Sequence, residues 1–418
     1  MGTIRQKADA RTRLMDVLRG LLATWVVLHH VVLVGGFNPD IYPWRVFARH
    51  GQEAVLVFFI LSGFAITRAL QTRPQRWLSF FIARLWRIYP VYLVALAIGI
   101  VVVLYTEQHA SLLPTLASLQ IVPWGMDEGT PHGPHILLHL VQAHGLAPSG
   151  WLRHVDTSLL APGWSLSTEF QFYVLAPFLI VVLLRPWIVG NIVPGLVLIT
   201  VGLWPFFTHD PLIAPANILR YLDLFVLGMI GAVMRDSHPR MKLAYCLLAG
   251  VIAIAGWRAG QIIIVTAVGV WLMFWWFSAL QLVERLMDTK VARFWLLIGA
   301  WSFPIYILHY PLARLLLICG VAVLPADRAT FLVAWVPATV VASYIAAALL
   351  HRYVEVPGMR YGKRLAEDRE RRLDRRQPAD VARADSDRLG DIIQSQVKSA
   401  TGLQYYCIFL NRKRLTYQ

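Results

Sequence analysis

The chain has 418 residues, of which 57% are hydrophobic and only 15% charged, and its formal net charge is +15. In a soluble protein of this length about a quarter of the residues would be charged, so the composition excludes an ordinary soluble domain. Apolar stretches of about twenty residues recur, while no regular ten-residue segments alternate with period two, so we expect an all-α, polytopic membrane protein and not an outer-membrane barrel.

About ten transmembrane helices are expected, followed by a charged tail. We place them at roughly 14–34, 53–70, 81–105, 164–184, 187–207, 216–234, 242–257, 260–282, 294–319 and 330–351. Most Lys and Arg residues outside the tail fall in the same alternate connections, and such residues collect on the cytoplasmic side. Both termini are therefore predicted to be cytoplasmic. We attribute the positive charge to this orientation and not to nucleic-acid binding.

The first expected helix carries two ionisable side chains, Arg19 and His30. Basic residues precede this helix, but no small-residue cleavage site follows it, so we expect an uncleaved membrane anchor. Eleven residues turn a helix by about 1100°, which brings the two side chains to nearly the same direction, about 16 Å apart along the axis. Taken alone, the pattern allows two interpretations: a snorkelling Arg with a hydrogen-bonded His, or a functional pair inside the membrane.

The next two helices contribute a packing motif and a basic motif. Ser62-Gly63 lets a neighbouring backbone approach closely, which favours packing over a catalytic serine. Arg84 and Arg87 lie three residues apart on one helix face at the expected cytoplasmic start of their helix. Guanidinium groups in this arrangement could bind phosphates bidentately, or could anchor the helix to anionic lipid.

The long outer segment at about 106–163 is rich in Pro, Gly and His. His132, His135 and His139 have a spacing that would suit zinc on a helix. Two nearby prolines disrupt the start of such a helix, so a polar external loop is the preferred interpretation. The three cysteines show no ligand spacing, and we expect no metal site.

The later helices place further titratable groups inside the membrane. Glu169 lies about a turn and a half into its helix, and a carboxylate there needs a partner or a function. His309 lies toward the outer side of the ninth expected helix. We therefore expect two layers, with Arg19, Arg84 and Arg87 in the cytoplasmic half and His30, Glu169 and His309 in the outer half. Such a polarity suits an anionic donor from inside and a neutral acceptor from outside.

From about Tyr361 the composition changes to a mixed-charge run with few apolar residues. Such a run is typical of a solvated helix or a disordered tail. We therefore divide the chain into a transmembrane domain at 1–360 and a charged, flexible cytoplasmic tail at 361–418, which we expect to be dispensable for chemistry.

An ordered set of motifs resembles the membrane-bound acyltransferase-3 family over about residues 14–360. The motifs are DVLRG with Arg19-x10-His30, GQEAVLVFFILSGF at 51–64, FIARLWRIYPVY with Arg84-x-x-Arg87, GWSLSTEFQFY at 163–173, LFVLGM at 224–229, SFPIYILHYP at 302–311 and VEVPG at 354–358. The resemblance implies about ten helices and transfer of an acyl group, usually acetyl from acetyl-CoA, to a hydroxyl of an extracytoplasmic glycan.

By this resemblance, His30 is the catalytic base and Arg84 and Arg87 contact the CoA phosphates. His29 precedes His30, so the spacing and not the residue type selects which one acts. We expect Arg19 to contribute to catalysis and donor binding, and Glu169 to orient His30. Substrate contacts are assigned to side chains of the same motifs: Ser62, Trp164, Ser165, Tyr173, His309 and Tyr310.

Three functions follow from these patterns. The leading hypothesis is a bacterial inner-membrane O-acyltransferase acting on a polysaccharide, lipopolysaccharide or oligosaccharide. Some relatives carry a fused hydrolase-like domain after the last helix, where this sequence has the charged tail. We therefore expect that this chain either completes the transfer itself or hands over to a separate extracytoplasmic partner. The alternative is a transporter or flippase for a glycolipid or acyl donor, although no internal repeat supports it. A sensor or structural membrane protein is a third, weaker interpretation.

Overall fold

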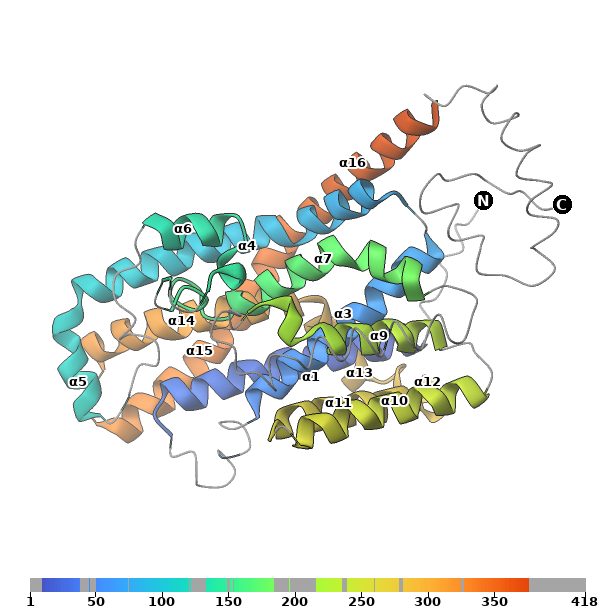
Figure 1. Cartoon of the computed structure of the whole chain (residues 1–418). Helices are drawn as coiled ribbons and strands as arrows, with labels where there is room; N and C mark the ends of the chain where they lie inside the picture. The colour runs from blue at the N-terminus through green and yellow to red at the C-terminus, as the bar shows by residue number, and fades with distance from the viewer. Residues whose placement is uncertain are drawn as a thin grey trace, which may run out of the picture.

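The computed structural model describes residues 10–37, 50–73, 75–119, 133–148, 151–183 apart from 153, 216–234, 239–258, 260–277, 281–324 and 327–375, with isolated further positions. Throughout these residues the regular structure is helical, as the composition predicts. Figure 1 shows the long helices running side by side as a bundle, with α16 extending from one end beside α4.

The first half of the chain supplies three long helices and a set of short outer elements. Their bounds are α1 Ala10–Val34, α3 Gly51–Thr72, α4 Trp77–Gln108, η1 Ala110–Leu112, α5 Leu113–Ser118, α6 Gly133–Leu140, η2 His144–Leu146 and α7 Gly163–Leu183.

The second half completes the bundle. Its elements are η3 Ile218–Arg220, α9 Leu222–Met234, α10 Pro239–Arg258, α11 Ile262–Phe277, α12 Gln281–Leu286, α13 Lys290–Ala300, α14 Ser302–Val323, α15 Arg328–Leu350, the π-helical turn η4 His351–Glu355, and α16 Val356–Arg375. Among the described residues, five helices are long and apolar enough to cross a membrane: Thr12–Val34, Gly51–Thr72, Trp77–Gln108, Ser302–Val323 and Arg328–Leu373. The protein is a multi-pass membrane protein.

Three expected spans have a different outcome from the rest. The span at 216–234 is the short helix η3 followed by α9, which has 13 residues. The span at 187–207 lies outside the described residues except for position 195. The span at 294–319 is two helices, α13 and α14, separated at Trp301. Gly299 near the end of α13 meets α1 so closely that an added Cβ would lie 1.9 Å from the Asp16 carbonyl oxygen. The close packing of α13 against α1 fixes the segment that carries Arg19.

Glycines also join α3 to α9 in the centre of the bundle. A Cβ on Gly63 would lie 2.0 Å from the Phe225 carbonyl oxygen, and a Cβ on Gly228 would lie 1.9 Å from the Ile60 carbonyl oxygen. The two helices therefore touch backbone to backbone, as small residues permit in membrane proteins. This confirms the packing role predicted for the Ser62-Gly63 pair, and it holds Ser62 beside the cavity described below.

The last helices form one continuous rod through α15, η4 and α16. Pro357 has no backbone N–H and crowds the preceding turn, which accounts for the π-helical turn directly before it. The boundary drawn at residue 360 falls inside α16, where the chain stays helical to Arg375. The division into two domains stays a prediction, and residues 376–418 lie outside the described part of the chain.

Candidate functional site

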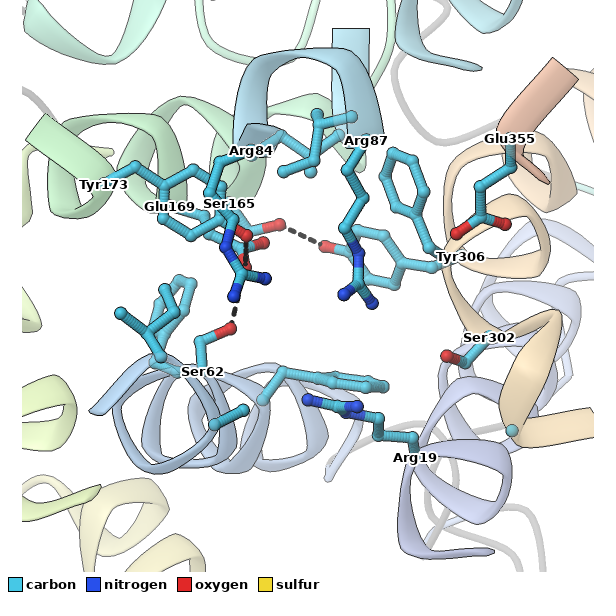
Figure 2. Close-up of a pocket in the computed structure, with 18 of the residues that line it drawn as sticks. Arg19, Ser62, Arg84, Arg87, Ser165, Glu169, Tyr173, Ser302, Tyr306 and Glu355 are labelled. Carbon is cyan, nitrogen blue, oxygen red and sulfur yellow. Dashed lines mark hydrogen bonds between the residues drawn. The ribbon is translucent and has the colours of Figure 1, made fainter. Parts of the chain in front are cut away.

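A cavity of about 520 Å³ opens between the helices where α1, α3, α4, α7, α14 and η4 meet (Figure 2). Seven of its polar side chains were expected as site residues: Arg19, Ser62, Arg84, Arg87, Ser165, Glu169 and Tyr173. Because Arg19 lies near the start of α1 and the other two arginines near the start of α4, both helices begin at the same end of the bundle.

The three arginines have different surroundings. Arg19 Nη1 lies 3.3 Å from Asp16 Oδ1, a partner on its own helix. The Arg84 guanidinium lies over the rings of Phe80 and Tyr173, at 5.5 Å and 5.9 Å from their centroids. Across the described part of the chain, no carboxylate forms a salt bridge with Arg84 or Arg87. Both guanidinium groups can therefore accept an anionic ligand in the cavity.

Glu169 lies with the arginines and not in a separate outer layer. Its Oε1 accepts hydrogen bonds from Ser62 Oγ at 2.7 Å and from Tyr173 OH at 2.6 Å. The two-layer arrangement expected from sequence thus differs from the structure at this residue, because the α7 helix brings Glu169 beside α4. The orienting role expected for Glu169 toward His30 stays a prediction.

Ser165 and Tyr306 form the far wall of the cavity. Ser165 Oγ lies 2.7 Å from Tyr306 OH and 3.2 Å from the Pro162 carbonyl oxygen, to which it donates. Trp164 packs outside this wall, with its ring 6.0 Å from Phe59. The wall therefore presents hydroxyl groups to the cavity.

His30 lies outside this cavity, against His309. His309 Nε2 and His30 Nδ1 are 3.0 Å apart, and the ring of Tyr310 lies 5.4 Å from that of His30. His30 Nδ1 also lies 3.0 Å from the Val26 carbonyl oxygen, and His309 Nδ1 lies 3.1 Å from that of Ile305. A carbonyl oxygen only accepts, so we assign the proton of each neutral ring to Nδ1. His309 Nε2 then accepts from His30, and the lone pair of His30 is on Nε2.

The neighbouring His29 has another environment. An added Cβ on Gly51 would lie 2.1 Å from His29 Cγ, so this imidazole packs against the start of α3. The two adjacent histidines therefore differ in their neighbours on other helices, with His30 facing α14, although their own rings meet edge to face at 4.9 Å.

Tyr306 connects the two centres along α14. It lines the arginine cavity, and its ring lies 6.2 Å from that of His309. One turn of α14 thus joins the arginine cavity to the histidine pair.

The profile of the acyltransferase domain family matches residues 13–352. The chain belongs to this acyltransferase family. It is similar to the peptidoglycan O-acetyltransferase OatA of Listeria monocytogenes, at 26% identity over 378 residues that cover 82% of this chain and 55% of the relative. The chain thus spans little more than half the length of that curated relative. No solved structure matches it.

Five polar side chains in the cavity of this acyltransferase were not among the predicted site residues: Asp16, Ser302, Tyr306, His351 and Glu355. His351 Nδ1 and Glu355 Oε2 lie 2.7 Å apart across the π-helical turn. In the sequence, the i,i+4 spacing of His351 and Glu355 shortly before Pro357 could have indicated this pair. Tyr306 could have been found from its place one turn before His309.

The histidines of the outer segment contact other side chains and backbone carbonyl groups within the fold. His139 Nδ1 lies 3.1 Å from Tyr92 OH and its Nε2 lies 2.8 Å from the Val155 carbonyl oxygen, while its ring stacks on that of His144 at 4.0 Å. Burial lowers the pKa of the His139 imidazole well below its usual value and that of His144 to about 4. His132 lies outside the described residues, and the part of the chain that is described contains no group of three His, Cys, Asp or Glu side chains suited to a metal.

Proposed function

We propose that this acyltransferase moves an acyl group, acetyl in the expected case, from cytoplasmic acyl-CoA to a hydroxyl of an extracytoplasmic glycan. The observation that carries the proposal is the convergence of Arg19, Arg84 and Arg87 on one cavity while His30, on the same helix as Arg19, pairs with His309. The Listeria relative is named as a peptidoglycan O-acetyltransferase, which supports the same reaction type.

The arginine cavity fits the charged end of the donor. Arg84 and Arg87 come from one helix face and have no salt bridge to another described residue, so they would bind the phosphates of CoA. Arg19 supplies a third positive charge. The carboxylates of Asp16, Glu169 and Glu355 share the cavity, and each has another polar partner. The donor's pantetheine arm would then extend along α1 toward His30.

The histidine pair fits the chemistry of transfer. His30 Nε2 takes the proton of the glycan hydroxyl, and the oxygen attacks the carbonyl carbon of the thioester. The carbon–sulfur bond breaks, and the sulfur leaves with the proton returned by His30. The products are the O-acyl glycan and free CoA, with His30 neutral again. No covalent acyl-enzyme is needed for this balance.

His309 serves His30 as a positioning residue in this scheme. Its Nε2 accepts the His30 Nδ1 proton at 3.0 Å, which keeps the lone pair on Nε2 and stabilises the imidazolium that forms. Glu169 would act in the arginine cavity, where it orders Ser62 and Tyr173 beside the donor. Trp164, Ser165 and Tyr310 remain proposed substrate contacts.

The proposed setting is a bacterial inner membrane with about ten spans and both termini in the cytoplasm. The acceptor would be a polysaccharide, lipopolysaccharide or oligosaccharide. A separate extracytoplasmic partner that delivers or receives the glycan is compatible with this arrangement. The positive-inside pattern of the connections supports the orientation.

A transfer assay with the purified protein tests the proposal. Protein in detergent is given acetyl-CoA labelled in the acetyl group and an oligosaccharide acceptor, and ester-linked label in the glycan is measured. We expect transfer by the wild type, a loss of about 10²–10⁴-fold in His30→Ala, and a mild effect in His29→Ala.

Two outcomes would contradict different parts of the proposal. Transfer at the wild-type rate by folded His30→Ala would exclude His30 as the base. A wild type that transfers no label but moves a glycolipid or acyl donor across vesicles would favour the transporter reading.

A further inference from the structure

The helix α16 packs along the start of α4, the helix that carries Arg84 and Arg87. Figure 1 shows the two helices side by side at the end of the bundle from which α16 extends. The match to the acyltransferase family ends at residue 352, before this helix begins. The contact therefore joins a segment outside the family match to the proposed donor site.

The first part of the contact is a close approach at Trp86, which lies between the two arginines in sequence. An added Cβ on Gly362 would lie 2.3 Å from Trp86 Cβ, and one on Gly358 would lie 2.8 Å from the Trp86 carbonyl oxygen. The ring of Tyr361 meets that of Trp86 edge to face at 4.6 Å. A Cβ is fixed to its backbone, so any side chain at Gly362 must displace one helix from the other.

The second part is a buried ion pair at the start of α4. Arg76 Nη1 lies 3.2 Å from Glu370 Oε2, and the Arg76 backbone N–H donates to Glu370 Oε1 at 3.1 Å. The two side chains are only 16% and 8% exposed. Arg76 precedes the first residue of α4, so the carboxylate also lies at the positive end of the helix dipole. Arg369 adds a hydrogen bond to the buried Ser79 at 3.3 Å.

The same rod forms part of the cavity wall. His351, Glu355 and Met359 line the cavity with Arg84 and Arg87. The rod thus contacts α4 on one side, and its own side chains complete the cavity on the other. A shift of α16 along α4 would change the distances between the arginines and this wall.

We propose that α16 positions the donor site, with Gly362 and Glu370 as positioning residues that hold Arg84 and Arg87 in place. The functional part of the chain then extends to Arg375, and not only to residue 360. The inference rests on the proposed function for the identity of the ligand, a phosphate-bearing acyl-CoA.

Glu370→Gln in the full-length protein is the direct test, since it removes the charge and keeps the shape. The matched control is Glu367→Gln on the same helix, where the pair with Lys363 is 53% and 61% exposed. We expect KM for acetyl-CoA to rise about tenfold in Glu370→Gln with kcat changed less than about twofold, and binding of free CoA to weaken by the same factor. Glu367→Gln should match the wild type, because exposed pairs contribute little.

Exchanging the charges of Arg76 and Glu370 distinguishes a positioning role from a general loss of folding. Glu370→Arg and Arg76→Glu should each raise KM, and the double variant should recover part of the loss. If Glu370→Gln is not obtained as monodisperse protein, Arg369→Gln carries the test, because it removes only the contact with Ser79. A KM equal to that of Glu367→Gln in the variant tested would overturn the inference. A wild type that does not bind CoA would instead overturn the proposed donor.

Discussion

At the scale of single residues, α1 connects two sites with different chemistry. Arg19 lies in a polar cavity with two further arginines, whereas His30, three turns along, meets the imidazole of His309. In the proposed reaction, the first environment binds the charged end of the donor, and the second fixes the tautomer of His30. Substitutions at the two ends of the helix should therefore affect different kinetic constants.

Substitution of His309 should lower the rate of transfer and leave donor binding intact. His309→Leu leaves the Val26 carbonyl oxygen as an acceptor of the His30 Nδ1 proton but removes the imidazole that stabilises the imidazolium of His30. We therefore expect kcat to fall about tenfold or more with KM for acetyl-CoA unchanged. His309→Gln can present a side-chain oxygen to the same proton and should keep more activity. The measurement is steady-state transfer of labelled acetyl. Equal kcat in His309→Leu and the wild type would contradict the positioning role.

Arg87→Lys should weaken donor binding although the charge is kept. A lysine is a point charge that cannot bind a phosphate through two parallel hydrogen bonds, so we expect KM for acetyl-CoA to rise about tenfold with little change in kcat. Arg371→Lys is the control, because the Arg371 side chain is 64% exposed on α16. An unchanged KM in Arg87→Lys would argue against phosphate binding at this position.

At the scale of elements, contacts between backbones decide how the helices are placed. Gly63 and Gly228 let α3 meet α9, Gly299 lets α13 meet α1, and Gly362 lets α16 meet α4. Each contact lies beside a segment that lines the cavity. The geometry of the site therefore depends on residues that never touch a substrate.

Gly228→Ala should destabilise the protein. The added Cβ would lie 1.9 Å from the Ile60 carbonyl oxygen, and overpacking of this kind costs about 1–3 kcal/mol. Gly250→Ala on α10 is the matched control, since nothing lies within 4 Å of its added Cβ. Thermal unfolding in detergent should show a lower midpoint for Gly228→Ala only. Equal midpoints for the two variants would refute the close α3–α9 packing.

The outer segment should loosen in acid. The pKa of buried His144 is about 4 in the folded state against an ordinary value of 6.5, and that of His139 is also lowered. The unfolded segment therefore binds more protons between these values. Its stability is complete above about pH 6.5 and falls as the pH drops toward 4. The protection factors of amides in residues 133–163, that is, exchange corrected for the intrinsic rate at each pH, should fall as the pH drops over this range. Protection factors that do not change with pH would contradict the assignment.

At the scale of the whole molecule, the sequence predicts the class of fold well and the relations between helices poorly. Hydropathy predicts the long helices because an apolar segment in the membrane must hydrogen-bond its backbone N–H and C=O groups within itself. The spacing of Arg19 and His30 placed them on one helix face, and the motifs led to Arg84 and Arg87. Which helix lies beside α4 was not predictable, because glycine contacts and one buried ion pair decide it. For this reason Glu169 was expected in the outer layer, and the packing of α16 along α4 was not predicted.

The central claim is that the protein acylates an extracytoplasmic glycan. Mass spectrometry of surface glycans from cells with the wild type, without the protein, and with His30→Ala tests it most directly. We predict alkali-labile acyl groups on the glycan in the wild-type cells and their loss in both other strains. Glycans of identical mass in cells with and without the protein would contradict the account.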